Sequence, residues 1–136
     1  MTRVLLIESD RALAQALAID CVDLGIAVRL AETLCDGVRV MMDSPVSLVL
    51  IDAALMRLPA SDQLRLFDAV APGVPVVVLA DDRASTEDVS KLRTQGFQVV
   101  AWPVDVLELF ATIGRPARPR PTRVAVTDRT EALCSG

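Results

Sequence analysis

The sequence predicts a doubly wound α/β sandwich, in which helices cover both faces of a five-stranded parallel sheet. Two observations carry this prediction. Short aliphatic runs alternate five times with segments of helical period. Three of these runs contain almost only aliphatic residues, which is typical of parallel strands buried on both faces. The expected strands are residues 4–7, 27–30, 48–51, 76–79 and 98–101.

Each expected strand is followed by a segment in which apolar residues recur every three or four positions. Gly25 is expected to end the first helix, and Ser85 and Gly96 to begin and end the fourth. The more polar strands, 27–30 and 98–101, suit the edges of the sheet. The apolar positions expected to face the core are Leu13, Leu17, Cys21, Leu24, Leu34, Val38, Met41, Leu64, Phe67, Ala71, Val89, Leu92, Val106, Leu109, Phe110 and Ile113.

The chain divides into a globular part and a basic tail. With 136 residues, of which 52% are hydrophobic, it can bury one core, which we place in residues 1–114. Residues 115–136 begin with prolines that alternate with arginine or alanine, which predicts an extended, disordered tail. The globular part carries a net charge of −7 and the tail +3.

Composition excludes several classes of function. The chain has no histidine, which excludes histidine acid–base catalysis, serine or cysteine triads that need histidine, and a phosphohistidine relay. Cys21, Cys35 and Cys134 have neither zinc-site nor disulfide spacing, so we expect a reducing compartment. No apolar stretch reaches the ~20 residues that span a bilayer, and no signal peptide is evident. The sequence predicts a cytoplasmic protein that is not an enzyme.

The most informative residue is Asp52, which directly follows the apolar run 48–51. Since parallel strands end at one edge of the sheet, the residues after each strand should form a common site. Several of them are acidic, which suits a hard cation such as Mg²⁺. The residues expected at this edge are Glu8, Ser9, Asp10, Asp52, Ala80, Asp81, Trp102 and Pro103.

Structural roles are the alternative for most of these residues. Ser9 or Asp10 can cap the first helix, and Asp81 can begin the loop after the fourth strand. Trp102 can plug the site or offer a stacking surface, but packing over the strand ends is the favoured explanation. Asp52 has the strongest claim to function, because it ends a central strand.

The pattern resembles the receiver domain of response regulators in two-component signalling, over residues 3–113. The resemblance implies a flavodoxin-like sheet of order 2-1-3-4-5 and a receiver-like domain in residues 1–114. Asp52 matches the phosphorylated aspartate of that family, and Glu8 matches the first acid of its Mg²⁺-binding pair. Pro103 matches the family's proline and is expected to follow a cis peptide bond.

The departures from the family bear on chemistry. Ser9 stands where the main metal-binding aspartate is expected, and Ala80 replaces the Thr or Ser that bonds the phosphoryl group. Trp102 replaces the lysine, Val99 an aromatic switch residue, and Asp81 a small residue. Loss of the lysine removes a charge-assisted hydrogen bond worth roughly 1.5–3 kcal/mol, and loss of the hydroxyl about 1 kcal/mol. We therefore expect no firm cofactor, and at most weak Mg²⁺ binding by Glu8 and Asp52.

The leading interpretation is a pseudo-receiver that acts by protein–protein contact with another signalling protein, such as a histidine kinase, a regulator or an effector. Val104, Leu107 and Phe110 are candidates for its docking face, which would be built from the fourth helix, fifth strand and fifth helix and could also form a homodimer. One alternative is a working response regulator, phosphorylated on Asp52 with Mg²⁺. The other is a sensor whose Trp102 stacks a planar ligand. Neither a membrane nor a nucleic-acid partner is expected.

Overall fold

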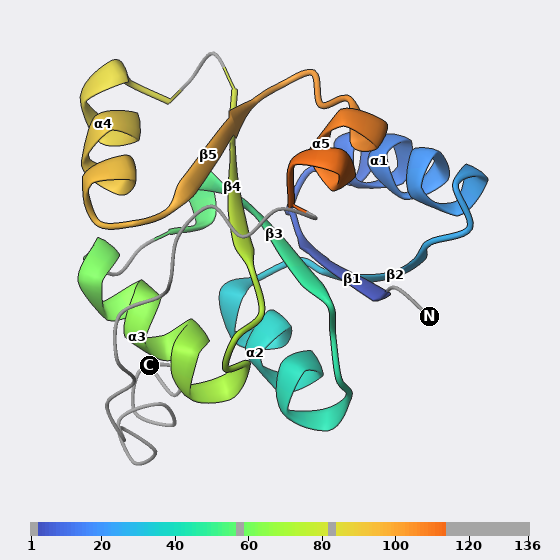
Figure 1. Ribbon diagram of the computed structural model, residues 1–136, viewed down its shortest axis with the longest axis horizontal. Helices are drawn as coiled ribbons and strands as arrows, with labels where there is room; N and C mark the ends of the chain where they lie inside the picture. Colours follow the sequence, from blue (N-terminus) through green and yellow to red (C-terminus); the bar gives the residue numbers. More distant parts are fainter. Residues whose placement is uncertain (1–2, 57–58, 82–83, 114–136) are drawn as a thin grey trace.

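The computed structural model describes residues 3–56, 59–81 and 84–113. Its centre is a parallel sheet of five strands in the order β2-β1-β3-β4-β5, which confirms the predicted fold class and strand order (Figure 1). The predicted tail, 115–136, lies outside the described residues. The strands are β1 (Arg3–Ile7), β2 (Ala27–Ala31), β3 (Leu48–Asp52), β4 (Val76–Ala80) and β5 (Gln98–Ala101).

Helices cover both faces of this sheet. The α-helices are α1 (Arg11–Asp23), α2 (Leu34–Asp43), α3 (Ala60–Val70), α4 (Thr86–Thr94) and α5 (Val106–Ile113), with a 3₁₀ turn η1 (Ala53–Leu55) after β3. The helices α1 and α5 lie side by side on one face, and α2, α3 and α4 cover the other (Figure 1). No helix in the described part of the chain is long and apolar enough to cross a membrane.

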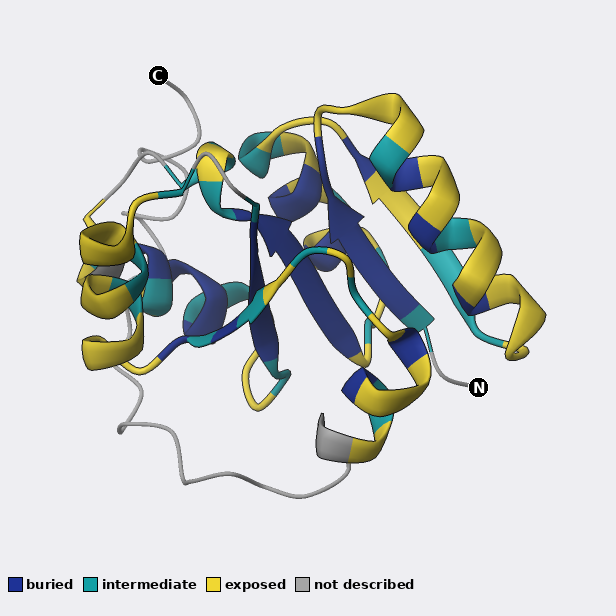
Figure 2. Cartoon of the chain, turned by 90° about the horizontal axis from the view of Figure 1, so that it is seen from above, coloured by how far each residue is buried: buried dark blue, intermediate teal, exposed yellow. Residues whose placement is uncertain are grey.

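The core consists of two apolar layers, one on each face of the sheet. Along β3, Leu48 and Leu50 pack in the layer under α1 and α5, whereas Val49 and Ile51 pack in the layer under α2, α3 and α4. Every residue of β3 and β4 is buried, as the continuous aliphatic runs predict (Figure 2). The outer strands β2 and β5 contain exposed residues, which confirms their prediction as edges.

Every predicted inward position with a described side chain is buried or half-buried except Leu24, which is a correction. Its side chain is 45% exposed, because α1 ends at Asp23 and Leu24 caps the helix instead of continuing its apolar face. Gly25 then takes a positive φ of 77°, which a glycine adopts without strain. The side chain of Ile113 lies outside the described residues.

Gly37 sets the close approach of α2 to the sheet. A Cβ built on it would clash with Cδ1 of Ile7, which is buried in β1, and would lie 2.8 Å from its Cγ1. We expect Gly37→Ala to lower the free energy of unfolding by about 1–2 kcal/mol, since overpacking outweighs the gain in helix propensity. Urea denaturation measures this, with Ala16→Gly on the exposed face of α1 setting the propensity scale. A more stable Gly37→Ala protein would show that Ile7 moves aside freely.

Candidate functional site

Two buried carboxyl groups meet at the edge where the strands end. Asp52 is the last residue of β3, and Glu8 directly follows β1, the neighbouring strand. Both residues are 3% exposed. Strand alternation directs both side chains to the face of the sheet that α1 and α5 cover. The structure therefore brings these two acids together at one edge of the sheet.

The two carboxyl groups are incompletely hydrogen-bonded. Asp52 Oδ1 accepts a bond of 3.0 Å from the backbone N–H of Ala54, in η1. Glu8 Oε1 accepts one of 3.0 Å from the N–H of Asp10, but Glu8 Oε2 is buried without a partner. No Lys or Arg within the described residues pairs with either carboxyl group. Their negative charge is thus not compensated by a cation from that part of the chain.

This environment changes the acidity of Glu8. Burial raises the pKa of Glu8 from 4.5 to about 7; the N–H of Asp10 opposes the rise, and the carboxyl group of Asp52 adds to it. When Glu8 is protonated, its hydroxyl can donate to the carboxyl group of Asp52, which gives the otherwise unpaired Oε2 a partner. Near neutral pH, Glu8 can therefore hold a proton beside Asp52.

Ser9 and Asp10, the next residues along the chain, are both exposed. Asp10 is the N-cap of α1, where its Oδ1 accepts from the N–H of Ala12 at 3.0 Å and of Leu13 at 3.3 Å. Of the two caps that the sequence allows, the structure thus has Asp10. The hydroxyl of Ser9 adds no negative charge beside Glu8.

The two residues that the sequence analysis matched to the hydroxyl and to the aromatic switch residue are both buried and apolar. Ala80 ends β4 and Val99 lies in β5, and both are buried in the layer under α2, α3 and α4. Asp81 follows Ala80 and is partly buried. Ala80 therefore offers no side-chain donor at the end of β4, where Asp81 adds an acid.

Trp102 is half-buried and packs against the core. Its ring lies against the layer under α1 and α5, and its backbone N–H donates to the carbonyl of Ala80 at 2.9 Å. The indole Nε1 is buried without a hydrogen-bond partner. The Trp102–Pro103 peptide bond is cis, as predicted. The structure thus has an aromatic ring, with no positive charge, directly after β5, at the position that the sequence analysis matched to the lysine.

Metal binding is limited by the number of ligands. Among the described residues, no group of three or more His, Cys, Asp or Glu side chains could hold a metal ion. Glu8 and Asp52 are the pair that could contact Mg²⁺, which binds through one or two carboxylates while keeping several waters. The donor set is compatible with Mg²⁺ but small.

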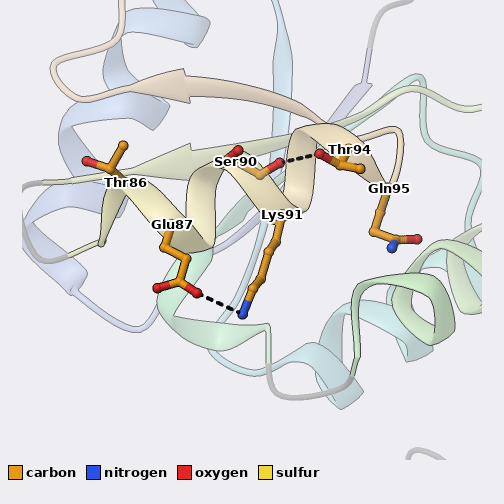
Figure 3. A pocket seen from close by; sticks show the side chains of 6 residues that line it. All are labelled: Thr86, Glu87, Ser90, Lys91, Thr94 and Gln95. Carbon is orange, nitrogen blue, oxygen red and sulfur yellow. Dashed lines mark hydrogen bonds and ion pairs between the residues drawn. The ribbon is translucent and has the colours of Figure 1, made fainter.

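A shallow surface groove on α4 is separate from these residues. Within it, Lys91, the single lysine of the chain, pairs with Glu87 at 3.4 Å, and Thr94 donates to the carbonyl of Ser90 (Figure 3). None of the predicted site residues lines the groove, so the lysine does not replace the one missing from the site. The lining residues are Thr86, Glu87, Ser90, Lys91, Thr94 and Gln95.

The fold and the strand-end acids resemble those of a receiver domain, and comparison with known proteins finds the same similarity. No family model matches the chain. It is 28% identical over 139 residues to the transcriptional regulatory protein GlrR of Escherichia coli K12, an alignment that covers 96% of this chain. The chain spans only 31% of that relative's length.

Solved structures show the same fold. A CheY-like response regulator receiver domain from Methanospirillum hungatei JF-1 has a TM-score of 0.69 at 21% identity, covering 84% of this chain and 91% of that one. A response regulator from Burkholderia pseudomallei, whose structure contains a phosphorylated aspartic acid and a calcium ion, has a TM-score of 0.69 at 20% identity. That match covers 82% of this chain and 65% of the other.

Sequence reasoning missed two buried polar residues of α3, Asp68, which is 8% exposed, and Gln63. The side chain of Gln63 is fully buried, and neither amide atom has a hydrogen-bond partner. The helical period indicates that Gln63 faces the core, because it precedes the buried residues Leu66 and Phe67 by three and four positions.

Proposed function

We propose that this chain is a pseudo-receiver of two-component signalling, which is poorly phosphorylated or not phosphorylated and acts by contact with another signalling protein. The observation that carries the proposal is the pair Glu8 and Asp52, buried together with no compensating cation in the described chain. Phosphoryl transfer to Asp52 would add further negative charge there, and catalysis of such transfer depends on cationic and hydrogen-bonding groups.

The residues at the other strand ends support the same proposal. Ala80 supplies no hydroxyl, and Trp102 supplies a ring packed against the core instead of a lysine. Bound Mg²⁺ would neutralise part of the charge, but Ser9 adds no carboxylate to hold it. The chain's own residues therefore bind a phosphoryl group weakly.

The docking face is proposed to lie on α4, β5 and α5, with a kinase, regulator or effector as the partner. Leu107 of α5 is 67% exposed, which leaves a large apolar side chain available for contact. Phe110 packs partly against the core and contributes less. The same face could pair two copies of the chain.

A working acceptor is the second candidate. Asp52 occupies the end of a buried central strand, and the Burkholderia pseudomallei structure of the same fold contains a phosphorylated aspartic acid. In this case Glu8 and Asp52 would hold Mg²⁺, with Asp10 or Asp81 in support.

Trp102 fluorescence distinguishes the two candidates, because Trp102 is the single tryptophan and follows β5 at the strand-end edge. We expect no saturable change on titration with millimolar Mg²⁺, nor with Mg²⁺ and beryllofluoride, a mimic of the phosphoryl group. Unfolding in urea provides the control that the probe responds to its surroundings. A saturable change that deepens with beryllofluoride and disappears in Asp52→Asn would instead establish the working acceptor.

A further inference from the structure

Gln63 is an exception among the side chains of the core. It is 0% exposed, and both Nε2 and Oε1 of its amide are buried without a hydrogen-bond partner. Buried polar side chains are almost always hydrogen-bonded, because an unsatisfied amide raises the free energy of the folded state. The proposed function does not use this residue, so its burial needs another explanation.

The position of Gln63 relates it to the start of α3. Leu66 and Phe67, on the same side of the helix, are buried in the layer under α2, α3 and α4. Since α3 follows β3 through η1, its first turn lies towards the edge where the strands end, and Gln63 belongs to that turn. The unsatisfied amide is therefore at the end of α3 that is nearer to the strand-end edge.

The first turn of α3 also lacks a side-chain cap. Its N-cap is Pro59, which makes no capping hydrogen bond, whereas Asp10, Thr33 and Ser85 cap α1, α2 and α4. A missing cap leaves the first N–H groups of a helix less well satisfied and its end less stable. Two independent features thus weaken the same turn.

We propose that the first turns of α3 exist in two states, closed on the sheet and open, and that the buried amide of Gln63 sets the balance between them. In the closed state, the amide has no partner; in the open state, water hydrates it. The segment that opens most easily is one whose closed form is least favourable. Opening uncovers apolar surface beneath α3. This surface is separate from the face formed by α4, β5 and α5.

This state change goes beyond the proposed docking function and does not depend on phosphorylation of Asp52. A connection to the strand-end site nevertheless exists. Asp52 accepts a hydrogen bond from the N–H of Ala54. Ala54 belongs to η1, which precedes α3 in the chain. A partner or ligand that prefers the open state would shift the population of α3 towards that state.

Residue-resolved hydrogen exchange of the whole chain tests the proposal. In the unmodified protein, we expect the amides of Leu66 and Phe67 to exchange at least tenfold faster than those of Val77 and Leu79 in β4, at a rate that low urea hardly changes. Gln63→Met keeps a similar side-chain length and removes the unsatisfied amide. It should slow exchange at Leu66 and Phe67 about tenfold or more.

Two further variants complete the test. Gln63→Leu gives the same comparison with a branched side chain, should the methionine pack poorly. Gln15→Met changes an exposed glutamine of α1 and should leave exchange in α3 unaltered. The proposal is wrong if the α3 amides exchange as slowly as those of β4, or if both Gln63 variants leave exchange in α3 unchanged. Faster exchange in these variants would also overturn it, by showing that bound water satisfies the amide in the closed state.

Discussion

Glu8→Gln should raise the free energy of unfolding at pH 8 by on the order of 2 kcal/mol and leave it nearly unchanged at pH 4.5. At pH 8, wild-type Glu8 is ionised while buried beside Asp52, and its Oε2 has no hydrogen-bond donor. A glutamine amide carries no charge, and its N–H can donate to the Asp52 carboxylate. The substitution thus reproduces the protonated form of Glu8 at every pH.

The direction of the pH dependence follows from the two pKa values of Glu8. In the folded protein the pKa is about 7, and in the unfolded chain it is close to the ordinary value of 4.5. Between these values the folded state binds the extra proton, so the contribution of Glu8 to stability is complete below pH 4.5 and is lost as the pH rises through 7. Wild-type stability should therefore fall over this window relative to the variant.

Urea denaturation at pH 4.5, 6 and 8 measures the difference between the two proteins. Glu87→Gln is the matched control. The Glu87 side chain is 79% exposed in its ion pair with Lys91, so this substitution should change the free energy of unfolding by a similar small amount at each pH. Asp52→Asn should weaken the pH dependence, since it removes the neighbouring carboxylate. An equal loss of stability in Glu8→Gln at all three pH values would contradict the raised pKa of Glu8.

The sequence was sufficient to predict the fold because the hydrophobic period specifies each element. Runs such as 48–51 and 76–79 are buried on both faces, and their aliphatic content reports that burial directly. Element ends were less certain, since they depend on caps and local hydrogen bonds. The period cannot show, for instance, that α1 stops at Asp23 and turns Leu24 outwards.

The candidate site could be predicted as a set of residues but not as an arrangement of atoms. Parallel strands end at one edge, which brings Glu8 and Asp52 together whatever their side chains do. The missing partner of Glu8 Oε2 and the packing of the Trp102 ring depend on side-chain positions in three dimensions. Gln63 was missed for a related reason, because a polar residue in a helix is normally assigned to the solvent side.

Restoring the family's residues should convert this site into a working acceptor. The triple variant Ser9→Asp, Ala80→Thr and Trp102→Lys adds a metal-binding carboxylate, a hydroxyl and a cation around Asp52. The lysine is worth roughly 1.5–3 kcal/mol and the hydroxyl about 1 kcal/mol. Since 1.4 kcal/mol is a factor of about ten in an equilibrium constant, we expect Mg²⁺-dependent beryllofluoride binding at least 100-fold tighter than in the wild type.

Fluorine NMR is the suitable measurement, because the triple variant has lost the single tryptophan. The triple variant carrying Asp52→Asn is the control and should bind no beryllofluoride. Circular dichroism must show that the fold survives, since Trp102 packs against the layer under α1 and α5. Equally tight binding by the wild type would refute the pseudo-receiver proposal. A folded triple variant without any gain would mean that another residue, with the acid Asp81 the first to replace, blocks the site. A gain that requires Asp52 would show that substitutions around the acceptor, and not the fold, prevent this chain from taking a phosphoryl group.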